Sequence, residues 1–345
     1  MKKILIIAIL LNSLFFLASC KTIGQKGSLG SNNKMNYLGG DYKGNYVWGG
    51  AMNLAWNELN QNILHEPLRL STNDKIALGM VGKLNNATFS NKDLDKSSYY
   101  VKSGYGQQTV ETINKESRDK FPEKSFGDLM ISLKPTDIIA YAYFLKKVEY
   151  MNAFKEITVK FNNEDVKGFF AYNGPQRKNV KILRYSNDDH FIVSIRLKDS
   201  SDELIMAKGY GMADPRGLVD EINMSSVSPV GDMDNGDRFA APKLHLDHER
   251  SYSELMDKFL ANAGFAEYSI EQMYEKIKFD MDEKGARVEN EAVIIGLENS
   301  PMVKQKVYKR LIFDKPYWVM MKRKNSKIPF FILGVSNTEL MEKAE

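Results

Sequence analysis

Apolar and charged positions alternate in the last third of the chain, and this alternation predicts two strands joined by a turn. In the first strand one face is apolar and the other charged, with Ile277, Phe279 and Met281 against Lys278, Asp280 and Asp282. The turn is acidic and ends at Gly285, where the chain can change direction at low steric cost. The alternation then resumes, with Ala286, Val288, Asn290, Ala292 and Ile294 on one side and Arg287, Glu289 and Glu291 on the other. The second segment can therefore also lie in a sheet.

A polar, basic stretch follows at residues 296–310 and predicts a long exposed loop. It contains the turn sequence Asn299-Ser300-Pro301 and four basic residues, Lys304, Lys306, Lys309 and Arg310. Two apolar strands then close the chain, at residues 317–321 and 328–335, joined by a polar turn.

The rest of the chain has helical patterns mainly toward its start and strand patterns in its middle. One helical face contains Met52, Ala55, Trp56, Leu59 and Ile63, and strands are predicted at residues 157–161, 180–185, 191–197 and 204–207. A further helix is expected after Ser251, because Ser251 and Glu254 form a capping box and Gly264 can end it. This segregation of helices and strands favours an α+β fold over a doubly wound sheet.

The first residues have the pattern of an exported and lipid-anchored protein. Lys2 and Lys3 precede an apolar run that is too short to be a spanning helix. The run ends in Leu17-Ala18-Ser19-Cys20, which resembles the lipobox of bacterial lipoproteins and implies cleavage before Cys20 and acylation of this residue. We therefore expect a signal peptide at residues 1–19, a flexible tether at 20–44, rich in Gly, Ser, Asn and Lys, and a folded domain at 45–345. The expected location is the bacterial cell envelope, periplasmic or surface-exposed.

Charge and cysteine content exclude several classes of protein. The formal net charge of +4 is too small to indicate a nucleic-acid partner. Cys20 is the only cysteine of the chain, so no internal disulfide can form and packing must supply the stability.

Enzymatic motifs are weak. His245 and His248 have a metal-like spacing, but their alternation with leucines favours a strand with one wet face. The acidic run from Asp280 resembles a calcium loop only in outline, because Lys284 would stand among the ligands. Gly209-Tyr210-Gly211 lacks the third glycine of a phosphate loop, and Asp188-Asp189-His190 reads as a turn. We expect no catalytic residue, no cofactor and no metal site.

Five segments together resemble the serpin family. LIFDKPYWVMM, residues 311–321, is similar to its C-terminal signature, and DEKGA, residues 282–286, is similar to the hinge that opens its reactive loop. The hinge stands a loop's length before the signature, which makes the match specific. Weaker similarity covers residues 139–154, 179–199 and 242–265. The chain departs from the family in two places: Val148 and Tyr150 stand where a tryptophan is usual, and an early Ser-Pro motif is missing, with only residues 76–80 resembling the helix that it begins.

The resemblance implies a serpin-like fold, in which N-terminal helices pack on a large mixed β-sheet beside a smaller C-terminal β-barrel and an exposed reactive loop. It also implies a monomeric inhibitor of serine or cysteine proteases, whose cleaved loop inserts into the main sheet as an extra strand. The hinge residues would be Glu283, Gly285, Ala286, Val288, Asn290 and Ala292. The scissile bond would join Asn299 and Ser300, with Met302, Lys304 or Lys306 as alternatives because the loop is long.

Two other interpretations remain open. A non-inhibitory serpin-like surface lipoprotein used for binding or adhesion fits the missing tryptophan and Ser-Pro motif. An unrelated periplasmic folding or transport component would have no protease-sensitive site between residues 296 and 310.

Overall fold

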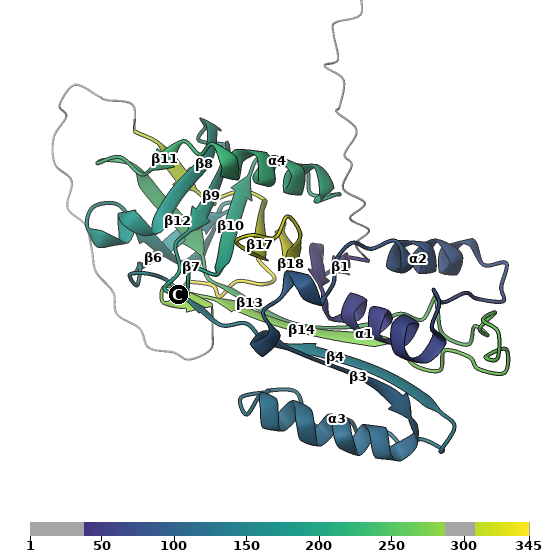
Figure 1. The fold of residues 1–345 in the computed structure, drawn as a ribbon. Coiled ribbons are helices and arrows are strands. Elements are labelled where there is room, and N and C mark those ends of the chain that lie inside the picture. The colour runs from purple at the N-terminus through teal and green to yellow at the C-terminus, as the bar shows by residue number, and fades with distance from the viewer. Residues whose placement is uncertain (1–37, 287–307, 345) are drawn as a thin grey trace, which may run out of the picture. The chain divides into compact units, whose positions relative to one another are not determined.

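The computed structural model describes residues 38–286 and 308–344, which form an α+β fold as expected (Figure 1). Its largest sheet has eight strands in the order β1-β2-β18-β17-β10-β9-β8-β11. These strands are β1 (Gly40–Tyr42), β2 (Asn45–Gly49), β18 (Pro329–Val335), β17 (Tyr317–Arg323), β10 (Asp202–Lys208), β9 (His190–Ile195), β8 (Val180–Asn187) and β11 (Gly231–Asp232).

This sheet differs from the expectation in its strand directions. All of its pairings are antiparallel, so it is not mixed. The smaller C-terminal barrel that we expected beside the large sheet is not confirmed, because among the described residues no ladder closes either the eight-stranded or the four-stranded sheet. The strands predicted near the C-terminus are confirmed as β17 and β18. Both are buried along nearly their whole length, which explains why their sequences are almost continuously apolar.

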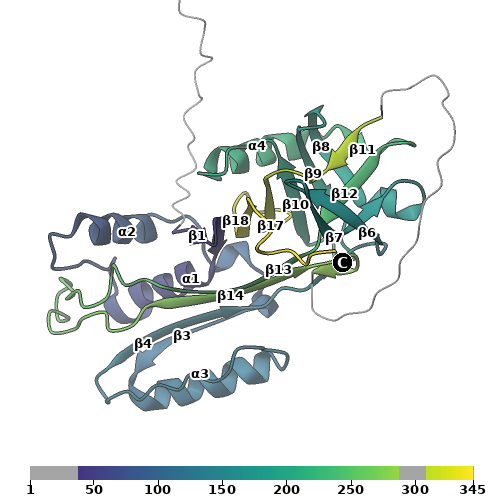
Figure 2. The same cartoon turned by 180° about the vertical axis from the view of Figure 1, so that it is seen from behind.

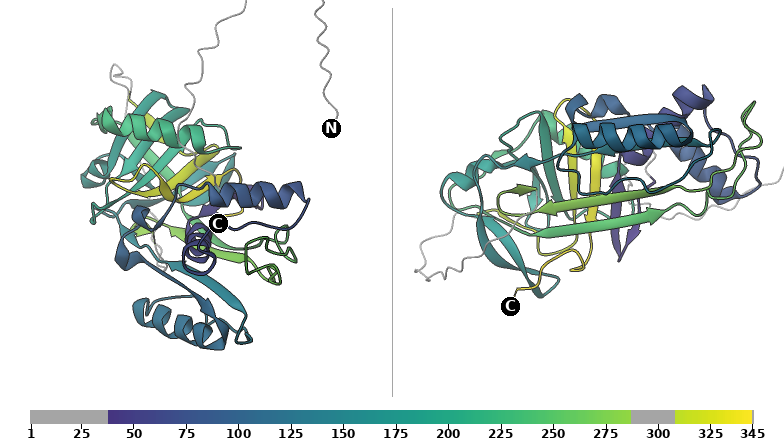
Figure 3. Two further views of the ribbon diagram at one scale, coloured as in Figure 1. Left: turned by 45° about the vertical axis from the view of Figure 1, so that its right-hand side comes forward. Right: turned by 90° about the horizontal axis from the view of Figure 1, so that it is seen from below.

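A second sheet of four strands packs against the first, in the order β16-β12-β7-β6. Its strands are β16 (Arg310–Ile312), β12 (Arg238–Pro242), β7 (Glu164–Ala171) and β6 (Lys155–Phe161), and only β12 and β16 run parallel. Aromatic contacts join the two sheets: Phe161 of β6 meets Tyr317 of β17 at 5.9 Å between ring centroids, and Phe313, just after β16, meets Phe191 of β9 at 5.1 Å. Helix α4 (Arg216–Val227) contacts β8 and lies across the larger sheet (Figure 3).

Two antiparallel ribbons complete the strands. One consists of β3 (Tyr99–Tyr105) and β4 (Ile138–Phe144), the other of β13 (Leu244–Ser251) and β14 (Tyr274–Met281). The predicted alternation in β14 is confirmed, since Ile277, Phe279 and Met281 are buried. The ring of Phe279 stacks on Phe331 of β18 at 4.6 Å, so this ribbon packs on the eight-stranded sheet. The shortest pair, β5 (Val148–Glu149) with β15 (Gly285–Ala286), is described below.

The early helices lie on the two faces of the β3–β4 ribbon. Helix α1 (Ala51–Leu59) continues as a π-helical turn to Leu64, and it contacts β3, β4 and β14. Helix α3 (Gly106–Lys120) contacts β3 and β4, and Figure 1 shows the ribbon between α1 and α3. Helix α2 (Lys75–Asn85), expected at residues 76–80, begins after Asp74, whose carboxylate accepts from the amides of Ile76 and Ala77. Short 3-10 turns occupy Asn91–Asp93, Lys96–Ser98 and Pro175–Asn179.

The helix predicted after Ser251 is wrong. Strand β13 continues through Ser251, which pairs with Tyr274, and the following residues form turns. Leu260 is held by a bridge to Leu70, and Leu255 is buried beside it in a second apolar cluster. Long-range pairing to a distant segment thus overrides a local helical pattern.

The expected signal peptide, Cys20 and most of the tether lie outside the described residues. Strand β1 begins at Gly40, a few residues before position 45, where we expected the folded domain to begin. Within the described part of the chain, no helix is both long and apolar enough to cross a membrane.

Candidate functional site

The edges of β4 and β14 face each other without pairing, and we call this pair of edges the seam. Figures 1 and 2 show the two strands side by side, and α1 contacts both. Each has a partner on its other edge only, β3 for β4 and β13 for β14. No backbone hydrogen bond joins β4 to β14 in the described residues. Their backbone groups are therefore available to a further strand.

A tight turn formed by residues 282–285 follows β14 at one end of the seam, and we call it the hinge turn. The Asp282 carboxylate accepts from the amide of Lys284 at 2.8 Å and from that of Gly285 at 3.0 Å. The amide of Asp282 donates back to the Gly285 carbonyl at 2.9 Å. A Cβ atom on Gly285 would lie 2.2 Å from the Val148 carbonyl oxygen, so the close approach of the two backbones requires glycine here.

The turn leads into β15, which pairs with β5, the short strand that follows β4 along the chain. Gly285 is opposite Glu149 and Ala286 is opposite Val148, in antiparallel register. Two further bonds hold the turn to this segment: the amides of Tyr150 and Phe154 donate to the carbonyls of Lys284 and Glu283. An antiparallel direction is also the one that a strand returning from β14 along β4 would have.

Glu283 forms an ion pair with Lys243, which lies between β12 and β13. Lys243 Nζ lies 2.7 Å from Glu283 Oε2 and also contacts the Glu156 carboxylate. Burial raises the pKa of Glu283, but its bond to Lys243 more than offsets this, so that the pKa falls below its usual value. The pKa of Lys243 is raised, because its two carboxylate partners outweigh its burial. The pair is therefore charged at neutral pH.

Tyr150 occupies the region where the resemblance led us to expect a tryptophan. Its ring is buried and meets Phe154 at 5.0 Å and Phe169 at 6.0 Å between centroids. Val148 is buried as well. An aromatic cluster thus supports the hinge turn from the core, although the expected side chain is absent.

The stretch of chain after α3, which we call the strap, contacts both strands of the seam. The ring of Phe126 contacts Tyr143 of β4 at 6.2 Å between centroids, and the Lys278 ammonium of β14 lies 5.3 Å from the centre of the same ring. One side chain thus connects the two strands.

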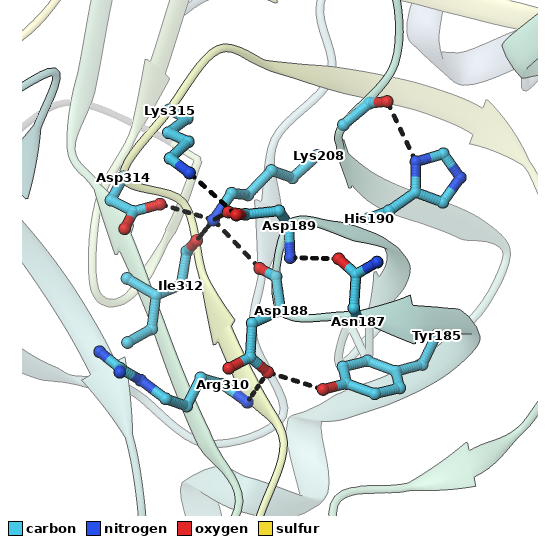
Figure 4. A network of polar contacts seen from close by, with 11 residues as sticks. Tyr185, Asn187, Asp188, Asp189, His190, Lys208, Arg310, Ile312, Asp314 and Lys315 are labelled. Carbon is cyan, nitrogen blue, oxygen red and sulfur yellow. Dashed lines mark hydrogen bonds and ion pairs between the residues drawn. The ribbon is translucent and has the colours of Figure 1, made fainter.

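A polar network around Lys208 holds β16, the first strand after position 307 that the structure describes (Figure 4). The Lys208 ammonium is buried and lies 2.5 Å from Asp314 Oδ1, 2.9 Å from Asp189 Oδ1 and 2.9 Å from the Ile312 carbonyl. The Asp188 carboxylate accepts from the amide of Arg310 at 3.0 Å and from the Tyr185 hydroxyl at 2.6 Å. Strand β16, which begins at Arg310, is therefore fixed to the turn between β8 and β9.

Several of these residues were not identified in the sequence. Asp188 and Asp189 do form the predicted turn, but the turn also anchors β16. Lys208 ends an apolar strand, and nothing in its local sequence indicated an ion pair, because its partner Asp314 is more than a hundred residues away. The Asp-Lys pair of the C-terminal signature now has a physical role: Asp314 pairs with Lys208, and Lys315 pairs with Asp189 at 2.9 Å.

Only part of the predicted site can be placed. Glu283, Gly285 and Ala286 lie in the hinge turn and β15. The other hinge positions Val288, Asn290 and Ala292 lie outside the described residues. The same is true of the candidate cleavage positions Asn299, Ser300, Met302, Lys304 and Lys306 and of the lipidation residue Cys20.

The histidine pair lies on a strand, as predicted. In β13 His245 is exposed and its Nδ1 lies 2.5 Å from Asp280 Oδ1, whereas His248 points inward beside the Tyr42 ring. The two side chains therefore point to opposite sides, and in the part of the chain that the structure describes no cluster of metal-binding side chains occurs.

Comparisons with known proteins agree with this architecture. No protein-family model and no curated protein sequence matches the chain. Among solved structures, the mouse protein Z-dependent protease inhibitor is similar over 86% of this chain and 91% of its own, with 11% identity and a TM-score of 0.51. Serpin48 of the insect Tenebrio molitor matches over 86% and 92%, with 13% identity and a TM-score of 0.45. Human thyroxine-binding globulin matches over 71% and 77%, with 11% identity and a TM-score of 0.43. The chain therefore has a serpin-like fold.

Proposed function

We propose that the protein inhibits serine or cysteine proteases by cleavage and insertion of the segment that follows the hinge turn. The observation that carries the proposal is the seam: two adjacent strands present unpaired edges, and the chain leaves β14 through a turn that already pairs beside β4. The serpin-like fold supports the same function, although it supports non-inhibitory members equally.

Strands β4 and β14 have seven and eight residues. A strand that pairs with both of them over this length makes a comparable number of net hydrogen bonds at roughly 1 kcal/mol each, or about 7 to 8 kcal/mol. Burying Asn290 without a partner costs about 1 to 3 kcal/mol, and fitting Val288 in a tight position costs about 1 to 3 kcal/mol. The balance favours insertion.

In the proposed reaction the protease supplies the catalytic residues. Its serine or cysteine nucleophile adds to the carbonyl carbon of the scissile residue, an acyl bond to the nucleophile forms, and the amine of the next residue leaves with a proton. Insertion of the freed strand then carries the acylated protease away and deforms its site before water can release it. Asn299-Ser300 is the proposed bond, with Met302, Lys304 or Lys306 as alternatives.

The same proposal places the protein at a bacterial cell envelope, attached through acylated Cys20. A tether of roughly twenty residues rich in Gly, Ser, Asn and Lys would let the folded part meet a protease above the membrane.

A second candidate function is binding or adhesion without inhibition. It is favoured by the missing tryptophan, in whose region Val148 and Tyr150 stand, and by the missing Ser-Pro motif, since only residues 76–80 resemble the helix that it begins. Val148 and Tyr150 border the hinge turn, where an inhibitor depends on exact movement.

A protease panel tests the first function against the second. A soluble form, residues 38–345, is incubated with trypsin-like, chymotrypsin-like and papain-like proteases and examined on a denaturing gel. Inhibition predicts a band at the summed mass of protease and inhibitor. Cleavage between residues 287 and 307 without such a band, for every protease that cuts, would contradict inhibition.

Matched variants sharpen this test. Ala292→Arg places a charge on the inward side of the predicted alternation, and Glu291→Arg places the same side chain on the outward side. We expect Ala292→Arg to be cleaved without a covalent band and Glu291→Arg to keep the band. If both variants behave alike, insertion with this register is wrong.

A further inference from the structure

A buried carboxyl of β14 caps the helix beneath the seam. Helix α1 begins after Gly50, which has no side chain to cap the first amides. The amide of Met52 instead donates to Glu275 Oε1 at 3.4 Å. The approach is close: a Cβ atom on Gly49 would lie 3.3 Å from the same oxygen and 3.1 Å from Ile277. Glu275 therefore joins β14 to the start of α1, 223 residues apart in the sequence.

The far end of α1 is joined to the opposite ribbon. Ser103 of β3 donates to Glu58 Oε1 at 3.0 Å. Helix α1 is thus fastened to β14 at its start and to β3 at its end, while it contacts β4 between them. Helix α1 therefore connects the two strands of the seam, and separating β14 from β4 strains its contacts. The hydrogen bond from the Met52 amide to Glu275 is the contact that joins α1 to β14.

The surroundings of Glu275 disfavour a charge. Its side chain is buried, at 7% exposure, and Oε2 accepts from the Tyr252 hydroxyl at 3.0 Å. Arg250 stands opposite in β13, but its guanidinium donates to the Leu38 carbonyl and stacks on Tyr252. Burial raises the pKa of Glu275 to about 7, despite the two hydrogen bonds and Arg250.

Few other groups near this carboxyl can titrate. His248, on the same face of β13, has a pKa lowered by burial and by Arg250, so it is neutral at pH 7. Beyond it, Tyr46 of β2 faces Arg250, and Glu254 faces Tyr252. The first turn of α1 carries no acidic side chain.

We propose that Glu275 is a proton-responsive clasp between β14 and α1, which holds the seam closed when neutral and favours its opening when ionised. A neutral carboxyl stays in the buried site without penalty, whereas a carboxylate is better solvated once the strands separate and water enters. This inference deepens the proposed function, on which it rests, because insertion requires the seam to open.

The size of the effect follows from linkage. With a pKa of about 7 when buried and 4.5 when exposed, the ratio of open to closed molecules rises about tenfold between pH 6 and pH 8. A neutral glutamine in the same place can accept from the Met52 amide through its carbonyl oxygen and donate its amide N–H to the Tyr252 hydroxyl oxygen, but it does not titrate. Glu275→Gln therefore removes this pH dependence.

Hydrogen exchange of the intact protein, without any protease, tests the clasp. Exchange of the amides in the first turn of α1, where that of Met52 donates to Glu275, is measured at pH 6, 7 and 8 and corrected for the intrinsic pH dependence of exchange. The wild type should show about a tenfold rise in opening relative to Glu275→Gln. Glu271→Gln changes an exposed glutamate just before the same strand and should match the wild type. Equal profiles for wild type and Glu275→Gln would overturn the proposal.

A second variant keeps the test decisive if Glu275→Gln does not fold. Tyr252→Phe removes a hydrogen bond that favours the ionised carboxylate, so the midpoint of the opening profile should move to higher pH. An unchanged midpoint would also overturn the clasp. Since no protease is present, these outcomes are independent of the covalent band: pH-dependent opening without a band would contradict inhibition alone.

Discussion

Lys243 Nζ lies 2.7 Å from Glu283 Oε2, and this ion pair connects the residue after β12 to the turn that ends β14. Both side chains are largely shielded, at 19% and 10% exposure, and Lys243 also contacts Glu156. The pair therefore fixes the turn that leads into β15, whose last residue, Ala286, is the last one described before position 308.

Removing one partner of this pair should destabilise the intact protein. Lys243→Met leaves the shielded Glu283 carboxylate with only the exposed Lys284, 3.6 Å away, as an ion-pair partner. We expect this loss to cost about 1 to 3 kcal/mol in the free energy of unfolding. Urea unfolding at pH 7 measures this value. Lys160→Met, at an exposed pair with Asp165, is the control and should change little. A loss from Lys243→Met no larger than that of the control would show that the pair does not hold the turn.

The same pair predicts a pH dependence in acid. The folded pKa of Glu283 lies below its usual value of 4.5, so its contribution to stability is complete above about 4.5 and is lost as pH falls through the folded value. Glu283→Gln should therefore be less stable than the wild type at pH 6, and the difference in the free energy of unfolding should shrink as pH is lowered to 3. Unfolding curves of both proteins across this range check the direction, and a difference that grows in acid would contradict it.

The buried Lys208 should matter more than the exposed Lys315, although both contact Asp189. Lys208→Met removes the ammonium that joins Asp314, Asp189 and the Ile312 carbonyl, and we expect a loss of about 2 to 4 kcal/mol. Lys315→Met should have little effect, because water screens that pair. Denaturant unfolding compares the two variants. Similar losses would mean that burial of Lys208 is not what makes its network stabilising.

Phe126 should slow the opening of the seam. Phe126→Ala removes one ring that contacts Tyr143 of β4 and Lys278 of β14. We expect the closed seam to lose about 1 kcal/mol of stabilisation, so that opening increases about fivefold. Hydrogen exchange of the Met52 amide, which donates to Glu275 of β14, measures the change at pH 7. Phe259→Ala removes an exposed phenylalanine elsewhere and serves as the control. Unchanged exchange in Phe126→Ala would show that the strap does not restrain β14.

Tyr150→Phe should be neutral or stabilising. The Tyr150 hydroxyl is buried and has no hydrogen-bond partner among the described residues, while the ring contacts are those that phenylalanine keeps. We expect a gain of up to about 1 kcal/mol by urea unfolding. A clear loss of stability would indicate that the hydroxyl does have a partner.

The sequence predicted those elements whose patterns are local. Period two gave β14, and continuous apolar runs gave β17 and β18, because burial of one or both faces determines these patterns directly. The helix after Ser251 failed because Ser251 pairs with Tyr274 and Leu260 with Leu70, contacts that no local pattern contains.

The candidate site was predictable in outline only. The hinge turn followed from Asp282 and Gly285, but Lys243 and Lys208 could not be paired with Glu283 and Asp314 before the chain was folded. Glu275 did leave a signal: it is in phase with Ile277, Phe279 and Met281, which places a carboxyl on the buried face of β14.

The central claim is that the segment after the hinge turn can enter the seam, and thermal unfolding before and after cleavage tests it most directly. The soluble protein is nicked between residues 287 and 307, the position is confirmed by mass spectrometry, and both forms are heated at the same pH. Since insertion adds a strand paired on both edges, the nicked protein should unfold at least about 10 °C higher than the intact one. A nicked protein that unfolds at the same or a lower temperature would contradict the account.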